Sequence, residues 1–164
     1  MVATEDPSSG AAGVPADVAD WWDAIRALIV ATDRIRRAWA ASAQLGVPEI
    51  TTLVLLQFTT PLRTQLVGAS TGLAPSSVTA LIDRLERRGH VRRIRPDNNR
   101  RVVLIELTTA GQDLSNALFG PLLDLLHQYE HDRDDEPELA VRVRALHHTA
   151  QFLEDAATTV CAPD

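Results

Sequence analysis

Apolar residues recur at intervals of three and four along most of the chain, which is the spacing of helices that bury one face. The first such helix is predicted over residues 17–43, with apolar positions at Trp21, Trp22, Ile25, Leu28, Ile29, Ile35 and Trp39. Gly46 ends it, and a leucine-rich second helix is expected over residues 48–58. After the stop Thr59-Thr60-Pro61, a short third helix is expected over residues 62–70.

A fourth helix is predicted over residues 75–88, and a glycine turn at Thr71-Gly72 separates it from the third. Its apolar positions fall at i, i+3, i+4 and i+7 and form one buried stripe of Val78, Leu81, Ile82 and Leu85. Pro75 suits the first helical position, and Gly89 suits the left-handed residue that ends a helix. The opposite face carries Ser76, Ala80, Asp83, Arg84 and Arg87, with Ser77 and Thr79 at its margins. This order is a helix-turn-helix, whose second helix enters a major groove of DNA.

Two strands and a turn follow this helix. Val91 and Ile94 make the first strand weakly alternating, whereas the second alternates cleanly at Val103, Ile105 and Leu107. The connection over residues 95–100 contains proline, asparagine and aspartate in positions typical of turns. A hairpin with arginines at its tip is typical of a wing, because an arginine can enter the narrow, negative minor groove of DNA and read its width.

The last third of the chain is predicted to be helical. Thr108 can cap a leucine-rich helix, which Gly120-Pro121 should interrupt and kink. An acidic stretch over residues 130–138 is expected to be a solvated loop. The final helix has a regular 4-3 spacing of apolar residues, at Leu139, Val143, Leu146, Ala150, Leu153, Ala157 and Val160. Three such heptads at the end of the chain favour dimerisation over packing on the chain's own core.

The distribution of charge changes the picture. The chain has no lysine, 16 arginines and a net charge of −6, and on that total alone it would be a poor ligand for nucleic acid. Eight of the arginines lie between Arg84 and Arg101, however, together with only two acids. A basic region on an acidic protein indicates a local site for a polyanion. The alternative is a solvated charged hairpin, which the helix-turn-helix context disfavours.

Length and composition set wider limits. A chain of 164 residues with 45% apolar content predicts one domain, or one domain with a dimerisation arm. No run of about 18 apolar residues is present, so no membrane span is expected. Residues 1–16 are expected to be a disordered tail, and they lack the features of a signal peptide. A single cysteine, Cys161, fits a reducing cytoplasm.

The segment TGLAPSSVTALIDRLERRGHVRRIRPDNNRRVVLIELTTAG resembles the winged helix-turn-helix of the MarR family, the multiple-antibiotic-resistance regulators. The features that match are Ser77-Val78-Thr79, Asp83-Arg84-Leu85-Glu86, Gly89, Arg93, Arg101, Leu107-Thr108 and Gly111. The order of helices extends the resemblance to about residues 18–160. It implies a mainly α fold with a small β-wing. The corresponding parts are an N-terminal dimerisation helix (17–47), a DNA-binding domain (48–108) and C-terminal dimerisation helices (109–164).

The resemblance implies a homodimeric transcriptional repressor that binds a pseudo-palindromic operator in double-stranded DNA and is released by a small-molecule effector. Helix 75–88 would enter the major groove and wing 95–101 the minor groove. The residues expected to contact DNA are Ser76, Ser77, Thr79, Arg84, Arg87, Arg95, Arg100 and Arg101. Arg88 and Arg92 could instead pair with carboxylates of the protein. An effector pocket is expected where the first and fifth helices meet the DNA-binding domain, lined by Trp39.

Two alternatives are open. One is a metal-responsive regulator, since His127 and His131 stand at i and i+4 beside Glu130, with His147-His148 in the next helix. The other is a MarR-like ligand-binding dimer that has lost DNA binding. It is supported by Asn99 where the family's wing has an acid, and by Ala80 where many members have a larger polar residue. The sequence has no glycine-rich phosphate loop or nucleophile elbow, so neither an enzyme nor a cofactor is expected.

Overall fold

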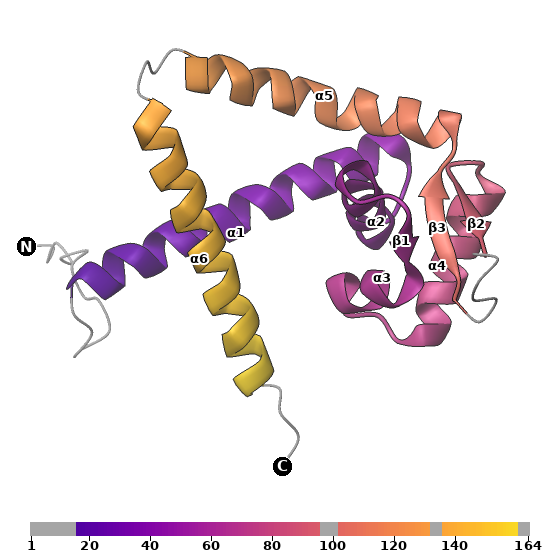
Figure 1. Ribbon diagram of the computed structural model, residues 1–164, viewed down its shortest axis with the longest axis horizontal. Coiled ribbons are helices and arrows are strands. Elements are labelled where there is room, and N and C mark those ends of the chain that lie inside the picture. The colour runs from indigo at the N-terminus through magenta and orange to yellow at the C-terminus, as the bar shows by residue number, and fades with distance from the viewer. Residues whose placement is uncertain (1–15, 96–101, 132–135, 161–164) are drawn as a thin grey trace, which may run out of the picture. The chain divides into compact units, whose positions relative to one another are not determined.

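The computed structural model describes residues 16–95, 102–131 and 136–160. It divides into two compact units, residues 1–118 and 119–164, which are described separately. The first unit begins with helix α1 (Ala16–Ala43), α2 (Val47–Phe58), the two-residue strand β1 (Leu62–Arg63) and α3 (Thr64–Thr71). It continues with α4 (Pro75–Arg87), strands β2 (Val91–Ile94) and β3 (Leu104–Leu107), and the start of α5 (Thr109–His131). The predicted mainly α fold with a small β-sheet is confirmed (Figure 1).

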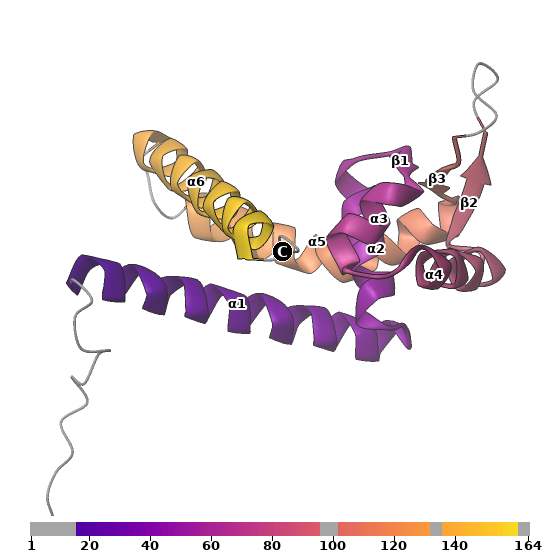
Figure 2. The same cartoon turned by 90° about the horizontal axis from the view of Figure 1, so that it is seen from below.

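The three strands form one antiparallel sheet in the order β1-β3-β2. Val91 of β2 pairs with Leu107, and Leu62 of β1 pairs with Ile105 on the other edge of β3. Figure 1 shows α2, α3 and α4 gathered beside this sheet, with the C-terminal end of α1 next to α2. Figure 2 shows β2 and β3 side by side, running beyond α4. The helix-turn-helix and the base of the hairpin therefore form one structural module.

The core of this module comes from the apolar stripes that the sequence predicts. Val78, Leu81, Ile82 and Leu85 are all buried along α4. They share the interior with fully buried residues of the neighbouring elements, among them Ile50, Leu53, Leu56, Val67, Val91 and Ile105. Burial of each such aliphatic side chain contributes about 1.5–3 kcal/mol. This packing fixes the rotation of α4 about its own axis, so its opposite face is exposed to solvent.

The start of the third helix differs from the expectation. Leu62 and Arg63 form strand β1 rather than the first turn of a helix, and α3 begins at Thr64. Leu62 is 2% exposed and pairs with Ile105, so β3 provides both backbone hydrogen bonds and an apolar contact. Two residues carry no periodicity, and only the presence of β3 makes them a strand.

The second unit contains the end of α5 and helix α6 (Glu136–Val160). α5 continues through Pro121 to His131, so the expected interruption at Gly120-Pro121 does not occur. A proline removes one hydrogen bond from a helix, and the remaining bonds keep this helix continuous. Both helices also extend into residues 130–138, which were expected to be an acidic loop. Residues 132–135 of this stretch lie outside the described residues.

Several apolar side chains of α6 are exposed in the single chain, among them Val141, Val143, Leu146 and Phe152. None of the described helices is both long enough and apolar enough to cross a membrane.

Candidate nucleic-acid interface

The exposed face of α4 has small polar side chains at its N-terminal end. Pro75 occupies the first turn, as predicted, and Ser76, Ser77 and Thr79 are all exposed. The hydroxyl of Thr79 donates to the carbonyl of Pro75 at 3.0 Å, which leaves its oxygen able to accept a further bond. Free backbone N–H groups in the first turn of a helix favour anions. This end of α4 therefore offers hydroxyl and amide donors with little steric obstruction.

The C-terminal end of the same face carries three arginines, each held by one nitrogen. Arg84 donates from Nε to Oε1 of Glu49 at 2.7 Å, and Arg87 donates from Nε to the carbonyl of Asp83 at 3.3 Å. Arg88 follows α4 and donates from Nη1 to the carbonyl of Gln44 at 2.6 Å. The three side chains are exposed, but each is held in place by one hydrogen bond to the protein.

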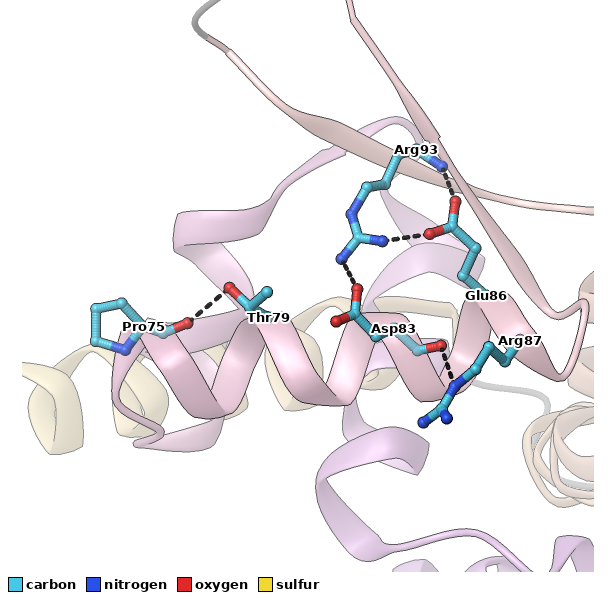
Figure 3. A network of polar contacts seen from close by, with 6 residues as sticks. All are labelled: Pro75, Thr79, Asp83, Glu86, Arg87 and Arg93. Carbon is cyan, nitrogen blue, oxygen red and sulfur yellow. Dashed lines mark hydrogen bonds and ion pairs between the residues drawn. The ribbon is translucent and has the colours of Figure 1, made fainter.

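Arg93 joins the base of the hairpin to α4 (Figure 3). Its guanidinium donates to Oδ1 of Asp83 at 2.5 Å and also to Glu86, and its backbone N–H donates to Glu86 at 3.2 Å. Burial alone would lower the pKa of Arg93, but hydrogen bonds and ion pairs with these two carboxylates outweigh burial and raise it. The permanently charged Arg93 therefore fixes strand β2 against helix α4.

The sequence left the roles of Arg88 and Arg92 open between DNA contact and pairing with carboxylates. Arg92 forms an ion pair with Glu106 across the strands, with Nε and Oε1 2.5 Å apart. Arg88 instead bonds a backbone carbonyl, that of Gln44, so its charge is not neutralised there. The two arginines thus have different surroundings despite their proximity in sequence.

Of the remaining residues expected to contact DNA, Arg95 is exposed at the end of the described hairpin. Arg100 and Arg101, together with Asn99, lie outside the described residues. Trp39 is half-buried in α1, and the expected effector pocket around it stays a prediction.

An open cavity of about 440 Å³ lies between α3, α4 and the sheet. Its lining is mostly apolar and includes Val78 and Ile82, with Thr79 and Arg93 among the polar groups. A second cavity of about 420 Å³ is lined by Arg84, Arg87 and Arg88 together with Gln44 and Glu49.

The hairpin is also tied to the start of α5. Thr108 caps this helix as predicted, since its Oγ1 accepts the N–H of Gly111 at 3.0 Å. The same residue donates from its backbone N–H to the carbonyl of His90 at 3.1 Å, and from its hydroxyl to the carbonyl of Gly89. Gly89 has φ +76°, the left-handed conformation that the sequence predicts there. Burial, and next the charge of Arg88, lower the pKa of His90.

Glu49 and Gln44 were not identified from the sequence. The spacing of Gly46 and Glu49 is that of a capping box, and the Glu49 carboxylate does accept the N–H of Gly46 at 2.5 Å. That local signal predicts a helix start but says nothing of Arg84, which lies 35 residues away. Among the residues that the structure describes, no three His, Cys, Asp or Glu side chains converge in a way that could hold a metal ion.

The chain is similar in sequence to known proteins. Residues 45–103 match the MarR family. Over 100 residues the chain is 36% identical to an uncharacterised HTH-type transcriptional regulator, YcgE, of Bacillus subtilis (strain 168). That match covers 58% of this chain and 61% of YcgE, less than two thirds of its length.

Solved structures extend the likeness to most of the chain. A MarR family protein from Bacillus stearothermophilus superposes with a TM-score of 0.65 at 24% identity, over 84% of this chain and 96% of that one. FabT of Streptococcus pneumoniae, solved in complex with DNA, superposes with a TM-score of 0.58 at 22% identity, over 83% of this chain and 99% of that one. At these identities the likeness is one of fold.

Proposed function

Residues 45–103 are a MarR-family winged helix-turn-helix, and from this premise we propose that the protein is a homodimeric transcriptional regulator that binds double-stranded DNA, most simply as a repressor in the cytoplasm. The family is one of transcriptional regulators rather than enzymes. The observation that carries the proposal is the exposed face of α4, with hydroxyls at one end and arginines at the other.

In the proposed complex α4 lies in the major groove. Ser76, Ser77 and Thr79 meet base edges or the phosphates beside them, and Arg84 and Arg87 contact backbone phosphates. The wing, residues 95–101, reaches the minor groove through Arg95, Arg100 and Arg101. The expected wing contacts rest on the sequence and the family resemblance.

The proposed dimer is supported by apolar side chains that are exposed in the single chain. On α1 they include Trp22, Ile29 and Val30, which are each 50% exposed or more, and on α6 they include the heptad residues Val143 and Leu146. Monomeric proteins rarely leave so many large apolar groups in contact with water. Two-fold symmetry then predicts a pseudo-palindromic operator with half-sites about 10 base pairs apart.

The dimer can be tested with Leu146→Glu, which places a charge in the proposed seam. Sedimentation should show a dimer for the natural chain and a large shift to monomer for the variant. Gln151, an exposed residue of the same helix outside the heptad positions, provides the control Gln151→Glu, which should stay dimeric. A monomeric natural chain would contradict the proposed assembly.

DNA binding is tested by measuring the affinity for a duplex as a function of salt. Neutralised phosphates release counterions, so log K should fall steeply and linearly with log salt. Arg87→Ala should weaken binding to every sequence and reduce the salt slope by about 1 for each bound subunit. Arg26→Ala removes an equally charged side chain from α1, outside residues 45–103, and should change the affinity little. A flat salt dependence for the natural chain would refute DNA binding.

The operator follows from sequencing the DNA fragments that the protein selects from its genome. The effector is the family-derived part of the proposal. It can be sought as a small molecule that raises the melting temperature and lowers the affinity for that operator.

A further inference from the structure

Glu49 is a buried carboxylate at the start of α2, with 7% of its surface exposed. Both of its oxygens are used: Oε2 accepts the N–H of Gly46 at 2.5 Å, and Oε1 accepts Nε of Arg84 at 2.7 Å. A charge removed from water needs such partners, and the positive N-terminal end of α2 adds to them. Capping explains the bond to Gly46, but it does not require a partner on α4.

Arg84 is held by Glu49 along one edge only. Its side chain is half exposed, and no acceptor within the described parts of the chain takes its two terminal nitrogens. Arg87 and Arg88 are each fixed in the same way, through a single nitrogen on a backbone carbonyl. All three arginines line the cavity of about 420 Å³, in which Glu49 is the one carboxylate among the lining residues.

We propose that this cavity binds a backbone phosphate of DNA and that Glu49 is a positioning residue for that contact. Glu49 orients Arg84 so that its two terminal nitrogens face the phosphate as a fork. The inference rests on the proposed function and adds to it a specific phosphate site and a residue that acts without touching DNA. A planar guanidinium held before binding loses less side-chain freedom when it binds, and its fork matches two phosphate oxygens.

The effect of removing the Glu49 charge has opposite signs under the two explanations. If Glu49 only adds negative charge near DNA, Glu49→Gln should bind DNA more tightly, because the local potential becomes more positive. If Glu49 positions Arg84, the same variant should bind more weakly, because an amide holds a guanidinium less firmly than a carboxylate does. The direction of the change therefore separates a positioning role from a simple charge effect.

The experiment measures the affinity of the full-length protein for a random-sequence duplex of about 30 base pairs, starting near 50 mM salt, because phosphate contacts are independent of sequence. Glu49→Gln should lower the affinity by roughly tenfold and reduce the salt slope by about 1 for each bound subunit. The matched control is Glu106→Gln, which breaks an ion pair of the same atoms, Nε and Oε1, on the neighbouring sheet. That control should leave the affinity unchanged or slightly higher. Melting temperatures at equal concentration confirm that both variants are folded.

A double-mutant cycle links Glu49 to Arg84. In the background of Arg84→Ala, which already lacks the contact, Glu49→Gln should have no further effect on DNA affinity. If Glu49→Gln does not fold, Arg84→Lys replaces it, since a lysine keeps the charge but cannot use one nitrogen for Glu49 and two for a phosphate. It should weaken binding by a similar factor.

Tighter or unchanged binding by Glu49→Gln, additive effects in the cycle, or full affinity of Arg84→Lys would each overturn the inference while leaving DNA binding intact. Loss of affinity with an unchanged salt slope would also overturn it, since a lost phosphate contact must lower the slope. Failure of the natural chain to bind any duplex would instead overturn the proposed function itself.

Discussion

Replacing Gly111 by alanine should disrupt the joint between the hairpin and α5. A Cβ atom at this position would lie 1.9 Å from the carbonyl oxygen of His90 and 2.8 Å from its carbonyl carbon. Real Cβ atoms essentially never come within 3.0 Å of another heavy atom, so one backbone must move by about 1 Å. The neighbour is main chain, which cannot give way as the end of a flexible side chain can.

The magnitude follows from what that movement breaks. The His90 carbonyl accepts the N–H of Thr108 at 3.1 Å, and the N–H of Gly111 donates to the Thr108 hydroxyl at 3.0 Å. Loss of a backbone hydrogen bond costs about 1 kcal/mol and loss of a helix cap about 1 kcal/mol. Overpacking strain adds roughly 1–3 kcal/mol. The free energy of unfolding should therefore fall by about 3–5 kcal/mol, and the melting temperature by roughly 10–15 °C.

The same helix contains a matched control in Gly120. A Cβ built there meets nothing within 4 Å apart from its chain neighbours. Pro121 follows and disfavours a Cβ on a helical residue before it, which offsets the gain in helix propensity, so Gly120→Ala should change the free energy of unfolding by less than about 1 kcal/mol. Urea unfolding of both variants at one protein concentration gives the comparison. The close approach of the two backbones would be refuted if Gly111→Ala were no less stable than Gly120→Ala.

Three further predictions concern the same module. Thr108→Ala should lower the free energy of unfolding by about 1 kcal/mol, while Thr108→Ser, which keeps the capping oxygen, should lose much less in the same urea titration. Burial and the charge of Arg88 lower the pKa of His90, so the folded state resists protonation; its contribution to stability is complete above pH ~6.5 and is lost as the pH falls below that value. His90→Phe should accordingly show a smaller drop in melting temperature between about pH 7.5 and 5, and an equal drop would count against the assigned cause. Arg93→Gln should lower the free energy of unfolding by about 1–2 kcal/mol, because it leaves two carboxylates without their shared partner. Arg92→Gln, which releases only one carboxylate, should lower it less, and equal losses would contradict the pairing of Arg93 with both carboxylates.

Local patterns in the sequence identified most elements of the fold. The buried stripe of α4 at Val78, Leu81, Ile82 and Leu85 follows from 3.6-residue periodicity, which any helix facing a core must show. Gly89 and Thr108 were identified by the backbone chemistry that ends one helix and begins another. These signals succeed because each depends on residues within about one helical turn of one another.

Partners distant in sequence could not be predicted in this way. Strand β1 exists because β3 offers Leu62 an edge 43 positions later, at Ile105, and the two residues 62–63 read alone as the start of a helix. Pro121 was expected to interrupt α5, but the hydrogen bonds on either side keep the helix continuous.

The sequence by itself determined that a basic, exposed helix face exists and which residues form it, because composition and periodicity are local properties of the chain. Only the tertiary structure decided how those arginines are held. Arg84 meets Glu49 across 35 positions and Arg88 meets the carbonyl of Gln44 across 44, while Arg93 is committed to Asp83 and Glu86. Folding brings these groups to within hydrogen-bonding distance, where charge and geometry select the partners of each arginine, and no local pattern records that choice.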